Sequence, residues 1–131
     1  MEYDVIFSTG MGALGGVTAC RLFRLDPESS AFILQSAENG GERLLLGDVR
    51  RLGPEALPVL SREELAALGC DADLSGLPDD VVVLCRLRIP HEKPQDAGFD
   101  MGCLVVVNMA NGLAVEAERP GAPFMPLSSQ R

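Results

Sequence analysis

Short apolar runs, separated by polar and turn-forming residues, recur along the whole chain and predict β-strands. In residues 19–25, for example, the side chains of Cys20 and Leu22 alternate with those of their neighbours. A period of two is typical of a strand with one buried face. The predicted strands share this pattern or a short continuous apolar run, and they are 3–8, 19–25, 31–37, 43–49, 81–90, 103–109 and 113–119.

Turn-forming residues lie between these runs. Residues 38–41 (ENGG) are a strong hairpin signal, residues 26–30 have turn chemistry, and Asn111-Gly112 is the pair that type I′ hairpin turns favour. The run at 81–90 begins VVVLC, so its early part is apolar on both faces and is expected to be central. Because no crossover helices intervene, the strands predict a mostly β fold, an antiparallel barrel or sandwich.

One helix is predicted, and both of its ends are marked in the sequence. Ser61 is an N-cap residue, and Glu64 three residues later completes a capping box. Leu65 and Leu68 place apolar side chains on one face, and Gly69 can close the C-terminal end. The helix is only about two turns long, so it must pack on the rest of the domain to be stable.

The chain has 131 residues, which predicts a single domain over 1–131 with one modest core. Two stretches are expected to be irregular. Residues 50–60 are broken by Pro54 and Pro58, and residues 119–131 form a tail rich in Pro and Gly.

Charge narrows the classes of partner. The formal net charge is −8 and the composition is 47% hydrophobic, that of an ordinary globular protein. Direct nucleic-acid binding would need clustered Lys and Arg, so we expect none. An acidic surface suits a basic protein partner, although it can equally serve only to keep the protein soluble. No apolar run is long enough for a membrane span and the N-terminal residues are acidic, so a cytoplasmic location without membrane contact is expected.

Candidate catalytic and metal-binding chemistry is sparse. The four cysteines, Cys20, Cys70, Cys85 and Cys103, form no C-x-x-C pair, and His91 is the single histidine. We therefore predict no metal site and no cofactor. His91 lies in a charged loop, and the adjacent carboxylates in the sequence are typical of solvated charges. The sequence predicts that the protein is not an enzyme.

A glycine-rich stretch, FSTGMGALGG, contains the Gly10-x-Gly12-x-x-Gly15 spacing of dinucleotide-binding proteins. That motif requires a helix immediately after the glycines, whose N-terminus faces the pyrophosphate. Here Gly16 follows, and strand-like alternation begins by Cys20. The glycines therefore predict a tight turn after the first strand and no nucleotide site.

In order and spacing, these segments resemble the flagellar assembly factor FliW family from Phe7 to about Leu127. The family's Leu-Gln-Ser strand is present at Leu34-Gln35-Ser36. Its Ser-x-Glu-x-Leu-x-x-Leu-Gly helix and its strand ending in Ile-Pro are also present, and the matching residues are Ser61, Glu63, Leu65, Leu68, Gly69 and Val81 to Pro90. A final buried strand ending in Asn matches Val105 to Asn108.

Several family positions differ in this sequence. The family's Gly-Ile-Pro-Gly-Phe-Glu reads Gly10-Met11-Gly12-Ala13-Leu14-Gly15, and its Asp-Pro reads Asp48-Val49. The segment before the last buried strand also departs from the family pattern, at residues 98–104. A diverged paralogue with altered partners is therefore one alternative.

The resemblance implies a small antiparallel β-barrel-like domain with one short helix and no catalysis. Family members bind flagellin, or else the RNA-binding translational regulator CsrA, whose repression of flagellin synthesis they relieve by an allosteric or a competitive route. Candidate partner-binding residues are Met11, Leu14, Gln35 and Asn108. For Gln35 and Asn108 the alternative is a structural hydrogen bond that closes a turn or bulge. A barrel that binds a small ligand near the glycine stretch is the alternative from another functional class.

Overall fold

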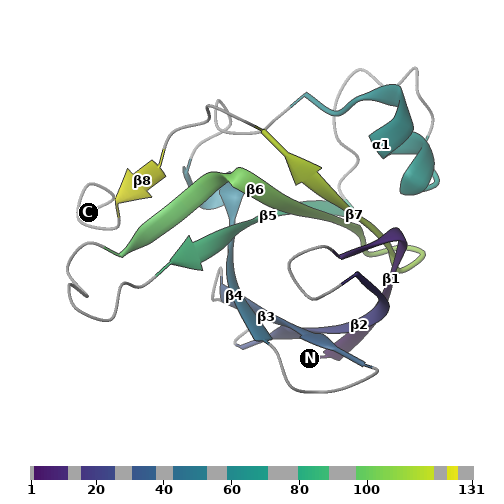
Figure 1. Cartoon of the computed structure of the whole chain (residues 1–131), viewed down its shortest axis with the longest axis horizontal. Helices are drawn as coiled ribbons and strands as arrows, with labels where there is room; N and C mark the ends of the chain where they lie inside the picture. The colour runs from purple at the N-terminus through teal and green to yellow at the C-terminus, as the bar shows by residue number, and fades with distance from the viewer. Residues whose placement is uncertain are drawn as a thin grey trace.

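The computed structural model describes residues 2–11, 16–25, 31–37, 43–52, 59–70, 80–88, 97–119 and 124–126, without the side chains of 8, 9, 11, 51, 52 and 124–126. The strands in these ranges are β1 (Glu2–Met11), β2 (Val17–Arg24), β3 (Ala31–Ser36), β4 (Arg43–Asp48), β5 (Val81–Arg88), β6 (Gly98–Asn108), β7 (Leu113–Glu118) and β8 (Phe124–Pro126). A 3₁₀ helix, η2 (Val49–Leu52), follows β4, and an α-helix, α1 (Arg62–Ala67), precedes β5. Figure 1 shows β1 to β7 arranged as a barrel with α1 beside β7.

Strands β1 to β7 form a closed mixed barrel, which confirms the predicted mostly β, barrel-like fold with one short helix. Each strand pairs antiparallel with the next along the chain. The closing pair differs from the predicted antiparallel pattern, because Ile6 and Phe7 of β1 pair in parallel with Leu113 and Ala114 of β7. Seven alternating strands explain this difference: with an odd number, the first and the last strand run in the same direction.

Strand β6 is longer than predicted and changes partner along its length. Residues 103–108 pair with β7, whereas residues 98–100 pair with β8. The change occurs at a bulge, where Cys85 pairs with Leu104 and the next residue of β5, Arg86, pairs with Asp100. The expected irregular tail therefore contains a strand. The Pro and Gly signal of the tail gave no indication of it, since a short edge strand needs only a few backbone bonds and tolerates Pro.

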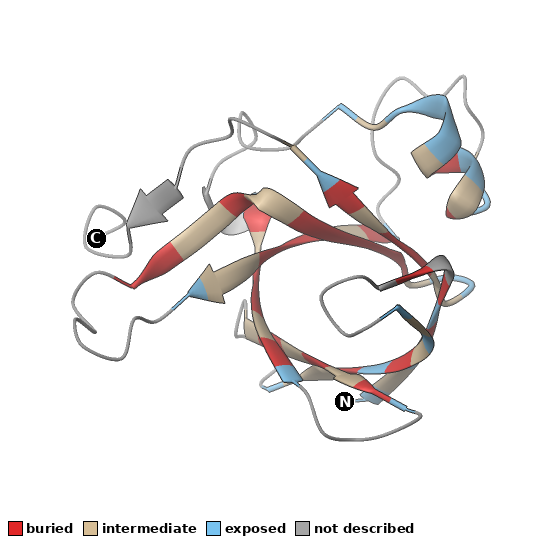
Figure 2. Cartoon of the chain, viewed as in Figure 1, coloured by how far each residue is buried: buried red, intermediate tan, exposed pale blue. Residues whose placement is uncertain are grey.

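The outer side of β5, β6 and β7 is buried, whereas the outer side of β2, β3 and β4 is not. Side chains on the outer side of β5–β7 pack beneath Leu68, the C-cap of α1, and Val49 of η2, and we call this side the covered face. Its buried strand residues are Val81, Val83, Cys85, Met101, Leu104, Val106, Val115 and Ala117. Figure 2 shows buried residues following one another along β5 and β6, in contrast to the alternation along β2 and β3. The observed burial along β5 agrees with the prediction that the early part of 81–90 is central.

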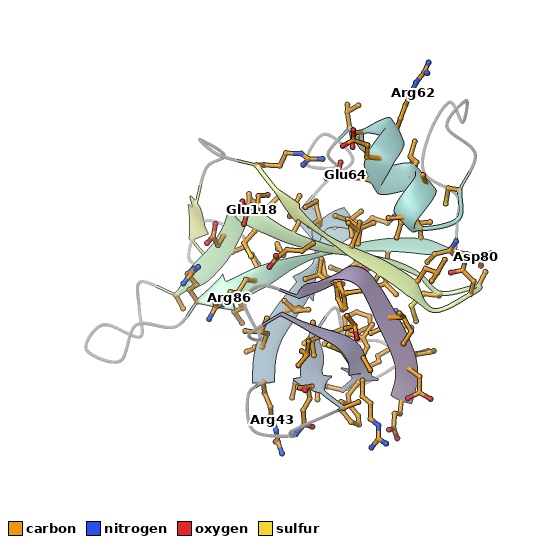
Figure 3. The ribbon with its side chains drawn as sticks, turned by 45° about the vertical axis from the view of Figure 1, so that its right-hand side comes forward. Arg43, Arg62, Glu64, Asp80, Arg86 and Glu118 are labelled. Carbon is orange, nitrogen blue, oxygen red and sulfur yellow. The ribbon has the colours of Figure 1, made fainter. Side chains whose placement is uncertain are left out.

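Helix α1 begins and ends at the predicted residues. The Ser61 hydroxyl accepts the Glu64 N–H at 3.1 Å, and the Glu64 carboxylate accepts the Ser61 N–H at 2.9 Å, so the capping box is complete. At the other end Gly69 has a φ of +72°, and the Cys70 N–H donates to the Leu65 carbonyl at 2.9 Å. This is a Schellman motif, which needs a left-handed residue at the glycine position. Figure 3 shows Arg62 and Glu64 on α1, at the opposite end of the molecule from Arg43.

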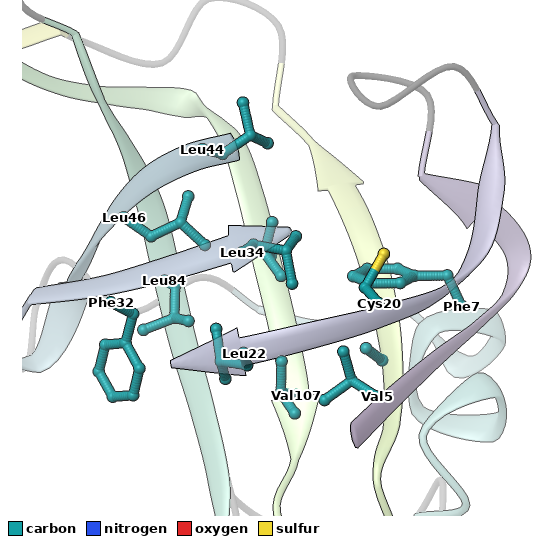
Figure 4. Packing of buried hydrophobic residues seen from close by; sticks show 12 residues of the cluster. Val5, Phe7, Cys20, Leu22, Phe32, Leu34, Leu44, Leu46, Leu84 and Val107 are labelled. Carbon is teal, nitrogen blue, oxygen red and sulfur yellow. The ribbon is translucent and has the colours of Figure 1, made fainter. Parts of the chain in front are cut away.

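The barrel interior is filled by apolar side chains from all seven strands. Phe7, Leu22, Leu34 and Leu84 are each fully buried there. Figure 4 shows these side chains converging between the strands, with Phe7 and Cys20 close to one another. Because the interior is packed, any binding site must lie on the outside or at the ends of the barrel.

The glycine stretch connects β1 and β2, where Met11 pairs with Val17. Gly10 has a φ of +82°, and a Cβ there would lie 2.5 Å from the Gly16 carbonyl oxygen, so this close backbone approach requires glycine. Strand β2 begins directly after Gly16, in the place where a dinucleotide motif needs a helix.

Two of the predicted connections differ from those observed. The turn at Asn111-Gly112 is not type I′, because that type needs a positive φ at both residues and only Gly112 has one. The connection from Asn108 to Leu113 has four residues, and the Gly112 N–H donates to the Asn108 carbonyl at 2.8 Å. The expected irregular connection at 50–60 begins with η2. The predicted turns at 26–30 and 38–41 lie outside the described residues.

Candidate protein-interaction surface

The outer side of β2, β3 and β4 presents two adjacent rows of side chains, and we call it the open face. The cross-strand register places Phe23, Ile33 and Leu45 side by side in an apolar row. The next row along the strands is polar and consists of Arg21, Gln35 and Arg43. All three apolar side chains are half-buried, and beyond them Leu25 is 56% exposed. No described helix lies over these two rows (Figure 1), whereas the Phe99 ring of β6 lies over Gly47, two residues beyond Leu45 on the same side of β4.

The two arginines of the open face differ in whether they form ion pairs. The Arg21 guanidinium lies 3.5 Å from the Glu2 carboxylate and 3.8 Å from that of Asp4, both on β1. Arg43 is exposed and forms no ion pair with any residue that the structure describes. The polar row therefore has an ion-paired arginine at one end and, at the other, an exposed arginine without an ion pair among the described residues, with Gln35 between them.

Of the four predicted partner-binding residues, the structure describes the side chains of Gln35 and Asn108, and it places them apart. Gln35 lies at the centre of the polar row, half-buried on β3. Met11 is the last residue of β1 and its side chain is not described, and Leu14 lies outside the described residues. Asn108 is at the far end of β6, where it pairs with Val81 and Leu113, so it does not adjoin Gln35. A role of these four residues in binding stays a prediction.

Asn108 joins α1 to the β6–β7 connection. Its side-chain Nδ2 donates to the Leu68 carbonyl at 2.9 Å, and its Oδ1 accepts the Ala110 N–H at 3.0 Å. The Asn111 Nδ2 donates to the same Leu68 carbonyl at 3.1 Å. Asn108 is only 8% exposed. The two amide donors satisfy the Leu68 carbonyl at the helix C-cap, and this is the structural alternative that was considered from the sequence.

A second link holds α1 against the end of β7. The two nitrogens of the Arg119 guanidinium lie 2.7 and 3.0 Å from the Glu64 carboxylate oxygens, and the same group donates to the Val59 carbonyl at 3.1 Å. The side chains are 15% exposed for Glu64 and 30% for Arg119. The hydrogen bond from Arg119 lowers the pKa of the Glu64 carboxyl below its ordinary value of 4.5. The bidentate pair holds α1 against the covered face, and neither of its residues belongs to the open face.

Two clefts open where β1 begins, away from the glycine stretch that follows its end. The larger has a volume of about 360 Å³ and is lined mainly by residues 2–5 and 109–112. The smaller, of about 190 Å³, shares Tyr3 and Met109 with it and includes Arg24, whose guanidinium lies 5.1 Å from the centre of the Phe32 ring. Val5 and Val107 of the interior cluster line the larger cleft and Phe32 lines the smaller, so both clefts border the packed interior at the end of the barrel where β1 begins.

The thiols and carboxylates of the described residues form no reactive cluster. Burial raises the pKa of the Cys85 thiol to about 12, and its Sγ lies 3.5 Å from the Gly47 carbonyl oxygen. Among the residues that the structure describes, no three His, Cys, Asp or Glu side chains could hold a metal ion together. His91 lies outside those residues. None of the described helices is long and apolar enough to cross a membrane.

The sequence analysis did not predict that side chains from β2, β3 and β4 form one continuous face. The signal was present in the alternation of 19–25, because Phe23 falls on the same side as Arg21, where a solvated strand would carry a polar residue. Ile33 and Leu45 repeat this exception on the next two strands. Their juxtaposition depends on the register between strands, which sequence alone does not fix.

The fold and its surface define a class of protein, a small mixed β-barrel with one outer face covered by a short helix and another that no described helix covers. No protein-family model and no curated protein matches the sequence. Among solved structures, the crystal structure of the flagellar assembly factor FliW is similar to this chain, with a TM-score of 0.73 and 18% sequence identity, covering 94% of this chain and 82% of that one. The chain therefore has the FliW fold, as the sequence resemblance implied.

Proposed function

We propose that this protein is a diverged FliW-type interaction module that binds flagellin and a CsrA-like RNA-binding regulator in the cytoplasm. By binding the regulator it would antagonise repression and couple flagellin synthesis to flagellar assembly. The observation that carries the proposal is the FliW fold over 94% of the chain. The order of the family's sequence motifs, which includes the helix at Ser61 to Gly69, supports it.

Charge also supports a basic protein partner. With a formal net charge of −8, the chain attracts a basic RNA-binding protein and repels RNA itself. Electrostatic attraction of this kind speeds encounter and is screened by salt. Binding to the regulator should therefore weaken as the salt concentration rises, whereas an interface dominated by apolar contacts should respond less.

Calorimetry with the flagellin and the CsrA-like regulator encoded in the same genome tests the proposal. We expect a dissociation constant in the range of about 1 μM or tighter for at least one of them, which corresponds to about −8 kcal/mol. Absence of binding to both at tens of micromolar would contradict the proposal.

A competition experiment then separates the two possible routes of antagonism. The regulator is saturated with a fluorescent RNA target, and this protein is added in increasing amounts. A competitive route raises the apparent dissociation constant of the RNA without limit, whereas an allosteric route raises it to a plateau set by the coupling free energy.

A further inference from the structure

The open face combines an apolar row and a polar row at a spacing that an α-helix can match. Neighbouring strands lie about 4.8 Å apart, so the row from Phe23 to Leu45 is about 10 Å wide, close to the diameter of an α-helix with its side chains. Along each strand the two rows are about 6.7 Å apart, because they are two residues apart. Residues four apart on a helix are separated by about 6 Å.

The charges on this face specify the chemistry of the helix further. Arg21 is already shared by Glu2 and Asp4, whereas Arg43 is exposed and unpaired among the described residues. A carboxylate on a docked helix would thus meet Arg43. Since the chain carries a net charge of −8, a strongly acidic helix would be repelled, and one carboxylate at this position is what the face accommodates.

We infer that the open face is a docking surface for an amphipathic α-helix of a protein partner. The helix lies along β2 to β4, with its apolar residues on Phe23, Ile33 and Leu45 and a single carboxylate one turn further that pairs with Arg43. This inference rests on the proposed function, because it supplies the binding surface of a protein-interaction module. Gln35, between the two arginines, lies beneath the polar edge of the helix.

Two synthetic peptides that differ in one residue test this surface without the natural partner. Both are helical, with Leu along one face and Gln and Ala elsewhere. One carries Glu one turn after the central Leu, and its twin carries Lys there. The full ¹⁵N-labelled chain is titrated with each peptide up to about 1 mM, a range that detects interactions of about −4 kcal/mol.

The expected result is a set of amide shifts confined to 21–25, 31–37 and 43–46, with the Glu peptide binding about threefold or more tightly than its twin. Arg43→Glu should reverse this preference. Arg62→Glu is the matched control, because Arg62 is an exposed arginine on α1 at the opposite end of the molecule (Figure 3), and it should leave the preference unchanged. Ile33→Thr, which keeps a β-branched residue in the strand, should weaken both peptides about fivefold.

The inference is overturned if neither peptide shifts these amides, if the shifts lie elsewhere, or if Arg43→Glu leaves the preference as it was. The dispersion of the amide spectrum shows for each variant that the barrel is intact. The outcome of the calorimetry with flagellin and the regulator is independent of the outcome of this titration. Loss of partner binding with intact peptide docking contradicts the proposed function alone. Partner binding without peptide docking contradicts the surface alone.

Discussion

The covered face and the open face belong to the same barrel and yet bury their outer side chains differently. On the covered face, Val83 and Val106 are completely buried beneath α1 and η2. On the open face, Ile33 and Leu45 are only half-buried, and the neighbouring row contains two arginines. The burial patterns reflect this difference, because β5 and β6 contain consecutive buried residues whereas buried and less buried residues alternate along β3 and most of β2.

The comparison shows which apolar residues need an explanation. A buried valine under a helix is accounted for by folding itself, since it belongs to a packed layer. A row of three half-buried apolar side chains on the outer side of strands that no helix covers is not accounted for in this way. The covered face should therefore respond to substitution through stability, and the open face through binding.

Leu68→Ala should give the largest loss of stability. Leu68 is completely buried at the C-cap of α1, in the cluster that joins the helix to β5, β6 and β7. Truncation of a buried leucine leaves a cavity, so we expect a loss of about 3 kcal/mol in the free energy of unfolding, measured by urea denaturation. A loss below about 1 kcal/mol would show that α1 does not form part of the folded core.

Asn108→Asp should cost less, about 2 kcal/mol, because one buried hydrogen bond is lost while the shape is kept. Aspartate can still accept from the Ala110 N–H, but it cannot donate to the Leu68 carbonyl. Asn111→Asp is the matched control, since Asn111 is exposed and donates to the same carbonyl, and water can replace its bond. If Asn108→Asp weakens partner binding at unchanged stability, Asn108 is a contact residue.

Much of this covered region could be predicted from sequence because its signals are local. Ser61, Glu64 and Gly69 lie within one short segment, and each was assigned its observed part in the helix ends. The bond from Asn108 to Leu68 joins residues 40 positions apart, so no local pattern reveals it. Similarly, Phe23, Ile33 and Leu45 form a row only through the register of three strands.

Glu64→Gln should have a smaller effect, about 1 kcal/mol, that depends on pH. Glutamine still completes the capping box, so the change removes only the charge from the pair with Arg119. The pKa of Glu64 is lowered in the folded state, so its contribution is fully present above the ordinary value of 4.5 and is lost as the pH falls through the folded pKa. The variant and the wild type should therefore differ in unfolding free energy at pH 7 and converge once the pH falls below the folded pKa of Glu64.

Glu63→Gln controls for the general effect of one carboxylate on α1. Glu63 is exposed on the helix next to Glu64, and it forms no ion pair with a described residue. Glu63→Gln should leave the free energy of unfolding at pH 7 within about 0.5 kcal/mol of the wild type. A pH profile of stability that changes equally in both variants would mean that the pair with Arg119 contributes nothing specific to the covered face.

The smallest effect on stability is expected on the open face, where Ile33→Thr can be matched with Val83→Thr on the covered face. Both changes keep a β-branched residue in a strand and add a hydroxyl group. At Val83, which is completely buried, the hydroxyl is desolvated and the expected loss is about 2 kcal/mol. At the half-exposed Ile33 it remains in contact with water, and we expect about 0.5 kcal/mol. Urea denaturation of both variants measures this difference. Equal losses would show that Ile33 is as much a part of the folded core as Val83, and its exposure would then not be available for a partner helix.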